Sequence, residues 1–133
     1  MKLIEVTCAI IVNKGKILAC QRKFKSDHPL KWELPGGKIE MGETETACIQ
    51  REIVEELGVN VRVLSKLTTL SYDYGFKKIT LIPFVCEIIS GILDAHEHES
   101  IKWLTLTEIK EVDWAEADRL LLKTNLKELK CWL

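Results

Sequence analysis

The chain has 133 residues, 47% of them hydrophobic and 29% charged, which is the balance of a folded domain and excludes a disordered chain. Its 19 lysines and arginines nearly match its 20 acidic residues, which argues against a protein that binds nucleic acid polymers through their phosphates. The five cysteines are widely spaced and form no Cys-x-x-Cys pair, so neither a disulfide framework nor a structural zinc site is expected. No stretch approaches the roughly 20 apolar residues that cross a bilayer. We therefore expect buried free thiols in a cytoplasmic protein without a membrane partner.

Apolar and β-branched stretches alternate with turn residues along the chain. They predict strands at residues 3–12, 17–21, 59–71, 79–89 and 100–104. The sequence Asn-Lys-Gly-Lys at residues 13–16 predicts a hairpin between the first two strands. Residues 23–31 are polar and contain Pro29, which predicts a loop. The stretch 79–89 is almost continuously apolar, which is typical of a strand buried on both faces.

A central helix is predicted at residues 44–57, ended by Gly58 in a left-handed conformation. Its core face is predicted to hold Ala47, Ile53, Val54 and Leu57. The opposite face carries Glu52, Glu55 and Glu56, whose spacing places three carboxylates side by side. Their repulsion is relieved if a hard divalent cation binds, and oxygen ligands favour Mg²⁺ or Mn²⁺ over zinc. A solvated acidic face has the same pattern, so both interpretations remain open on these residues alone.

Two helices are predicted near the end of the chain. Thr105 and Glu108 form a capping-box pattern for a short helix. Asp113 with Glu116 predicts the start of a longer helix that runs toward Leu129 and packs its leucines onto the sheet. Strands with one central helix and terminal helices predict a single α/β domain over residues 1–133, in which helices sandwich a mixed sheet.

The residues around the central helix resemble the Nudix box, G-x5-E-x7-R-E-U-x-E-E-x-G-U, where U is a bulky aliphatic residue. Every fixed position is filled, by Gly37, Glu43, Arg51, Glu52, Ile53, Glu55, Glu56, Gly58 and Val59. A match of this length at fixed spacing is specific. The resemblance implies the Nudix α/β/α sandwich with a catalytic loop-helix-loop, and hydrolysis of a nucleoside diphosphate linked to another group.

The resemblance also implies roles for individual residues. A metal site of Mg²⁺, with Mn²⁺ as the alternative, is expected from Gly36, Glu52, Glu55, Glu56 and Glu97. The catalytic residues are expected to be Arg51, Glu52, Glu55 and Glu97, with Arg51 and Glu43 bracing the loop onto the helix. Glu97 precedes Trp103 as a metal-approaching glutamate does in enzymes related to MutT, and Glu52, Glu97 and Glu99 all remain candidates for the general base. His96 and His98 flank Glu97, but without a third spaced ligand they do not indicate zinc.

The flanking residues resemble MutT-type enzymes, which cleave nucleoside triphosphates to the monophosphate and pyrophosphate. The expected substrate contacts are Arg22 and Lys38 for phosphate, with Leu34 and Asp118 nearer the base. An ionised aspartate only accepts hydrogen bonds, so Asp118 suits a base edge with N–H groups, as in an oxidised guanine or a cytosine. Residues 1–38 carry eight basic against three acidic residues, whereas 39–58 carry six acidic residues and one arginine. A basic segment suited to phosphates therefore precedes an acidic helix suited to a metal.

We therefore predict Mg²⁺-dependent hydrolysis of a modified dGTP such as 8-oxo-dGTP, or of a pyrimidine triphosphate, in nucleotide-pool sanitation. The partner is a small nucleotide and not a nucleic acid polymer, and the protein is a monomer or a homodimer. A dinucleotide polyphosphate substrate remains an alternative, since Tyr72 and Tyr74 lie near the position of a tyrosine in that branch. A non-catalytic nucleotide-binding module, and an interaction domain that uses residues 120–133 with an exposed Trp132, are alternatives of another class.

Overall fold

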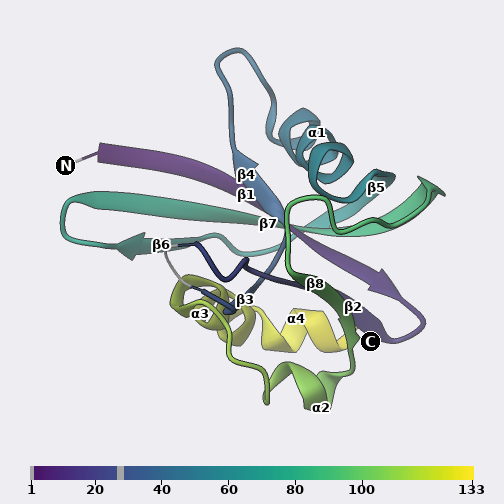
Figure 1. The fold of residues 1–133 in the computed structure, drawn as a ribbon. Coiled ribbons are helices and arrows are strands. Elements are labelled where there is room, and N and C mark those ends of the chain that lie inside the picture. Colours follow the sequence, from purple (N-terminus) through teal and green to yellow (C-terminus); the bar gives the residue numbers. More distant parts are fainter. Residues whose placement is uncertain (1, 27–28) are drawn as a thin grey trace.

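The computed structural model describes residues 2–26 and 29–133, and it has a mixed sheet between two layers of helices (Figure 1). The strands are β1 (Lys2–Asn13), β2 (Lys16–Gln21), β3 (Trp32–Glu33), β4 (Gly36–Lys38), β5 (Val59–Lys66), β6 (Leu70–Asp73), β7 (Lys77–Gly91) and β8 (Ser100–Leu104). The helices are α1 (Glu45–Leu57), α2 (Leu106–Ile109), α3 (Glu116–Thr124) and α4 (Leu126–Lys130). Residues 27 and 28 of the predicted loop lie outside the described residues.

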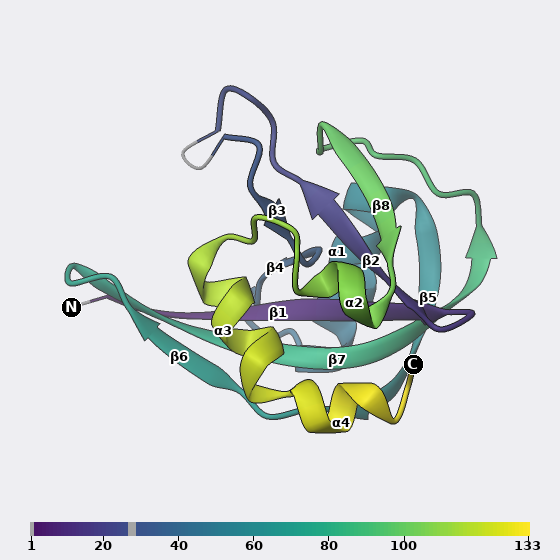
Figure 2. The ribbon, with the colours of Figure 1, turned by 90° about the horizontal axis from the view of Figure 1, so that it is seen from below.

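The two longest strands, β1 and β7, form the centre of the sheet. They run parallel, with paired residues from Lys2 and Lys77 to Ile11 and Cys86. The other pairings are antiparallel: β2 and β4 pair with β1, β5 and β6 pair with β7, and β3 and β8 pair with β2. Figure 2 shows β1 and β7 side by side along the molecule. The mixed sheet and the predicted hairpin of the first two strands are confirmed.

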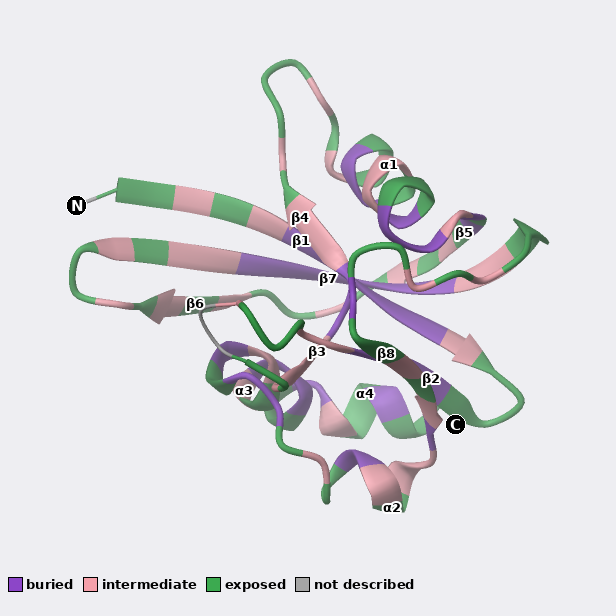
Figure 3. Cartoon of the chain, viewed as in Figure 1, coloured by how far each residue is buried: buried purple, intermediate pink, exposed green. Residues whose placement is uncertain are grey.

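The sheet has one hydrophobic core on each face. Along β1, Cys8 and Ile10 face the core under α3 and α4, whereas Ala9 and Ile11 face the core under α1. This alternation follows from the period of two along a strand. Figure 3 shows the buried segments of β1 and β7 at the centre of the molecule. Residues 81–86 of β7 are all buried, which confirms the prediction of a strand covered on both sides.

Helix α1 begins and ends where the sequence predicts. The Thr44 side chain accepts a hydrogen bond from the Ala47 amide at the start, and Gly58 at φ 70° closes the end. The predicted core face is wrong in part, because Ala47 and Val54 are exposed. The buried residues are Cys48, Ile49, Ile53, Glu56 and Leu57. The helix is rotated from the expected orientation, so that Cys48 faces the sheet: its thiol lies 3.2 Å from the Thr7 hydroxyl on β1 and 3.4 Å from the Lys38 carbonyl on β4.

One buried side chain, Asn125, explains two further differences from the sequence prediction. Its amide donates to the carbonyls of Thr68 (2.9 Å) and Leu121 (3.0 Å), and its Oδ1 accepts from the Thr68 amide (2.9 Å). The predicted strand 59–71 is therefore interrupted at residues 67–69, where the backbone bonds to Asn125. The predicted long C-terminal helix is likewise divided into α3 and α4 at this residue.

The predicted cap of that helix is also wrong. The N-cap residue of α3 is Ala115, which offers no side-chain hydrogen bond. The Asp113 carboxylate instead contacts Lys31 at 2.8 Å, and Glu116 pairs with Arg119 three residues later. The capping box of Thr105 and Glu108 on α2 is confirmed.

The cysteines are free thiols. Cys8, Cys20, Cys48 and Cys86 are buried as expected, whereas Cys131 is exposed near the end of the chain. Within the described ranges, no helix combines the length and the apolar character that a membrane span requires.

Candidate active site

Arg51 on α1 joins the loop before the helix to the acidic face. Its guanidinium donates to both carboxylate oxygens of Glu43, from Nε at 2.6 Å and from Nη2 at 3.0 Å. The hydrogen bonds from Arg51, together with one from the Glu40 amide, lower the pKa of Glu43 to about 2. The Nη1 atom of Arg51 reaches Glu52 at 2.9 Å and Glu55 at 3.2 Å. Arg51 therefore links the loop to two of the expected metal ligands.

Gly37 lies so close to the Glu52 carboxylate that no side chain would fit at this position. A Cβ atom on Gly37 would lie 2.3 Å from the Glu52 carboxyl carbon, closer than any real contact allows. The absence of a side chain thus lets the β4 backbone lie directly against this carboxylate. Gly37 fills a fixed position of the sequence motif, and the structure gives a physical reason for a glycine there.

Glu56 is the most buried of the three glutamates, at 5% exposure. Its Oε2 accepts a hydrogen bond from the Gly36 amide at 3.1 Å. Burial raises the pKa of Glu56 to about 9, and the charges of Glu52, Glu33 and Glu97 add to the shift. The acidic face of α1 is therefore not simply solvated, because it places a buried carboxyl group among other acids.

The segment between β7 and β8 brings Glu97 to the same region. The amides of Asp94 and His96 donate to the carbonyls of Leu57 (3.0 Å) and Glu56 (3.2 Å), which lie at the C-terminal end of α1. These bonds satisfy carbonyls that have no partner within the helix. The connection holds Glu97 close to Glu56 although 41 residues separate the two in sequence. Glu99 is exposed, and its amide donates to Gln21.

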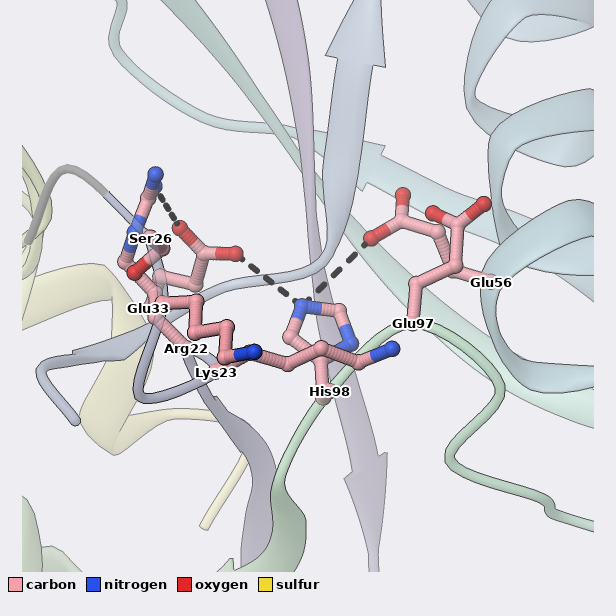
Figure 4. Close-up of a pocket in the computed structure, with 8 residues that line it drawn as sticks. Arg22, Lys23, Ser26, Glu33, Glu56, Glu97 and His98 are labelled. Carbon is pink, nitrogen blue, oxygen red and sulfur yellow. Dashed lines mark hydrogen bonds and ion pairs between the residues drawn. The ribbon is translucent and has the colours of Figure 1, made fainter. Parts of the chain in front are cut away.

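His98 and Glu33 are two site residues that the sequence prediction misses. The buried His98 ring places Nε2 3.0 Å from Glu33 Oε2 and 3.7 Å from Glu56 Oε1, as the dashed lines in Figure 4 show. Glu33 also accepts from Arg22 at 2.7 Å. Burial opposes ionisation of Glu33, but the bonds from His98 and Arg22 outweigh it and lower its pKa. The sequence carried one signal, the two histidines that flank Glu97, and it was considered only as a possible zinc site.

A cavity of about 330 Å³ opens between these groups and the loop after β2. We call it the carboxylate cavity, and it is lined by Arg22, Lys23, Lys25, Ser26, Glu33, Glu56, Glu97 and His98 (Figure 4). The lining includes three cationic side chains and three carboxylates, and one of each, Arg22 and Glu33, are paired at 2.7 Å. A cavity lined by both cations and carboxylates can hold a polyanion together with its metal ion.

A second cavity, of about 540 Å³, adjoins the first and contains the four expected substrate residues, Arg22, Leu34, Lys38 and Asp118. We call it the Asp118 cavity. Asp118 on α3 accepts a hydrogen bond from the Leu34 amide at 3.0 Å through Oδ1. Burial raises the pKa of Asp118 to about 7, with a further contribution from the charge of Glu33. Near neutral pH this carboxyl group therefore both donates and accepts, whereas the sequence argument treated it as an acceptor alone.

The chemistry of the donors fits a hard divalent cation. Within residues 2–26 and 29–133, no three carboxylate, histidine or cysteine side chains converge into a preformed cage, and Glu52 and Glu55 are paired with Arg51. The candidate ligands are nevertheless all oxygen donors. Burial and, after it, the charges of the neighbouring carboxylates raise the pKa of Glu56, and a bound cation would oppose this shift. Gly36 lies beside them through its bond to Glu56.

The site therefore combines acidic residues of α1 with cationic residues of the loop after β2, as a hydrolase of phosphate esters or anhydrides requires. The NUDIX domain family matches residues 1–130, so the chain belongs to the NUDIX family and is a Nudix hydrolase. Members of this family generally depend on a divalent metal.

Individual relatives extend the likeness. The chain is 37% identical to the CTP pyrophosphohydrolase of Escherichia coli, over 92% of this chain and 91% of the relative. It is 31% identical to the 8-oxo-dGTP diphosphatase of E. coli, over 97% of this chain and all of the relative. The solution structure of the E. coli ORF135 protein superimposes with a TM-score of 0.83 at 35% identity, covering 96% of this chain and 91% of that one.

Proposed function

We propose that this protein is a nucleoside triphosphate pyrophosphohydrolase that removes modified or surplus nucleotides from the pool. The products are the monophosphate and pyrophosphate, and the preferred substrate is 8-oxo-dGTP, a related modified dGTP or a pyrimidine triphosphate. The names of the relatives support this class of reaction. We place the enzyme in the cytoplasm as a monomer or homodimer that acts on free nucleotides.

The observation that carries the proposal is the joining of the two cavities. Arg22 and Glu33 line both the carboxylate cavity and the Asp118 cavity. A base in the Asp118 cavity therefore has a direct path for its phosphates past Arg22 to the glutamates of α1. A nucleotide with a chain of phosphates fits this arrangement, with the base in the Asp118 cavity and the phosphates in the carboxylate cavity.

Each expected catalytic residue has a specific role in the proposal. Glu52, Glu55, Glu56, Glu97 and the backbone of Gly36 would hold Mg²⁺ or Mn²⁺. When bound, such an ion neutralises phosphate charge and lowers the pKa of a bound water. Arg51 keeps Glu52 and Glu55 in place through the contacts at 2.9 and 3.2 Å, with Glu43 holding the guanidinium from the other side. Glu52, Glu97 and Glu99 remain the candidates for the group that accepts the proton of the attacking water.

The base site would select its substrate through polar groups around an apolar wall. Leu34 and Cys8 contribute apolar surface, and Asp118 contributes a carboxyl group that the Leu34 amide holds through Oδ1. Lys38 lies at the same cavity and would contact phosphate or sugar oxygens.

A panel of nucleotides with Mg²⁺ tests this proposal. It should include the ordinary NTPs and dNTPs, 8-oxo-dGTP, ADP-ribose and a diadenosine polyphosphate. We expect kcat/KM for one triphosphate to exceed that for the ADP-ribose and dinucleotide substrates at least about tenfold, a difference that one well-made contact of ~1.4 kcal/mol supplies. A higher kcat/KM for the diadenosine polyphosphate would contradict this proposal and favour the alternative, a hydrolase of dinucleotide polyphosphates.

A further inference from the structure

The loop that follows β2 carries cationic side chains for which the function above has no role. Lys23 and Lys25 line the carboxylate cavity together with Arg22, Glu56 and Glu97. Neither lysine forms an ion pair with another residue of the part that the structure describes, whereas Arg22 is paired with Glu33. Two lysines that line a cavity together with carboxylates, without an ion pair to them, leave space for an anionic ligand among these groups.

Buried polar atoms in the same cavity point to the same conclusion. Among the described residues, the buried side-chain polar atoms without a hydrogen-bond partner are Arg22 Nε, Ser26 Oγ and His98 Nδ1. All three belong to residues that line the carboxylate cavity. Buried donors are normally paired, because an unpaired one loses its hydration without compensation. An oxygen-rich ligand in this cavity would provide acceptors for the Arg22 N–H and the Ser26 hydroxyl.

The order of the cavities gives the direction in which a nucleotide lies. With the base beside Asp118, the phosphate nearest the sugar reaches Arg22, which lines both cavities. The remaining phosphates then extend between the lysines and the glutamates. We propose that Lys23 and Lys25, with Ser26, form a subsite for the two terminal phosphates, so that the enzyme selects triphosphates over diphosphates and retains pyrophosphate as a product. This inference rests on the proposed function, since it assigns the end of the same substrate.

The test compares Lys23→Gln, Lys25→Gln and the double variant with Lys110→Gln/Lys130→Gln, which removes the same charge from exposed positions near the other end of the chain. We expect each single variant to raise KM for the triphosphate about 3- to 10-fold, within the range of a partly exposed charge-assisted hydrogen bond. The double variant should lose kcat/KM for the triphosphate at least about fivefold more than for the diphosphate of the same base. Equal losses on the two substrates would contradict the subsite.

A binding measurement separates this inference from the proposed function. Calorimetric titration of inorganic pyrophosphate with Mg²⁺ requires no turnover, and the double variant should bind it at least about tenfold more weakly than the lysine control. If the protein hydrolyses no triphosphate but the double variant loses pyrophosphate binding, the proposed function fails and the anion subsite stands. If triphosphates are hydrolysed and the double variant matches the control, the subsite is wrong and the function stands. Wild-type protein that binds no pyrophosphate would also overturn the subsite.

Discussion

The buried ring of His98 places its Nε2 atom 3.0 Å from Oε2 of Glu33, across 65 residues of sequence. This contact ties the segment before β8 to β3, and the amides of Asp94 and His96 tie the same segment to the end of α1. Glu97 therefore lies between two anchored positions. In the sequence His-Glu-His, the backbone of His96 and the ring of His98 thus position Glu97 beside Glu56.

We predict that His98→Gln lowers kcat about tenfold or more with little change in KM, because Glu97 loses its support. Lys102→Gln is the control, since Lys102 is exposed on β8, the strand that follows His98. The decisive readout is a double-mutant cycle with Glu97→Gln. Glu97→Gln should reduce kcat strongly in the wild-type background and little in the His98→Gln background. Additive losses would mean that His98 supports the fold without positioning Glu97.

The raised pKa of Glu56 predicts how metal-free stability depends on pH. Below its ordinary value of 4.5 the carboxyl group is protonated in both states, and between 4.5 and about 9 only the folded state retains the proton. The free energy of unfolding should therefore fall as the pH rises through this range. Glu56→Gln should reduce the slope in urea denaturation at several pH values, whereas Glu45→Gln, a change at a half-buried position at the start of α1, should not. An unchanged slope in Glu56→Gln would contradict the burial of a carboxyl group that keeps its proton in the folded state.

Binding of a metal should lower the raised pKa of Glu56. Because Glu56 must lose its proton to bind a cation, the apparent Mg²⁺ affinity should rise from pH 6 toward pH 8, and Mg²⁺ should raise the melting temperature. Titration calorimetry in buffers of different ionisation enthalpy measures the proton released. Binding without proton release would place the metal away from Glu56.

Asp118 should determine how the enzyme discriminates between bases. Its pKa of about 7 means that it donates a hydrogen bond below neutral pH and only accepts above it. We expect the ratio of kcat/KM for two bases to change between pH 6 and pH 8, and Asp118→Asn to remove that change. Glu116→Gln, on the exposed side of α3, is the control. A pH-independent ratio in the wild-type enzyme would remove Asp118 from contact with the base.

Local sequence signals were sufficient for much of the fold. Thr44 and Gly58 define the ends of α1 through hydrogen bonds within one turn. The continuous apolar residues of β7 were enough to predict that this strand is buried on both faces. The glutamates of the site were found because helical spacing alone brings them together. Asn125 was not predictable in the same way, because its three hydrogen bonds include two to Thr68, which is distant in sequence. His98 was missed for the same reason, since its role depends on Glu33 on another strand.

The long-range role of Asn125 has its own test. Asn125→Ala leaves the Thr68 amide and carbonyl without their partner, and we expect a loss of about 2–3 kcal/mol in the free energy of unfolding. Thr124→Ala, at the exposed neighbouring position, should change it by less than about 0.5 kcal/mol. Urea denaturation measures both variants. Equal stability of the two would mean that the break between α3 and α4 does not depend on this side chain.

The products of triphosphate hydrolysis test the central claim most directly. With Mg²⁺, ion-exchange chromatography should show monophosphate and pyrophosphate in equal amounts from the wild-type enzyme and from Glu45→Gln. Glu55→Gln and Glu56→Gln should remain folded and lower kcat at least about 100-fold, as expected when a charge needed mainly in the transition state is removed. Release of diphosphate with orthophosphate, or near-normal turnover by both glutamine variants, would contradict the account.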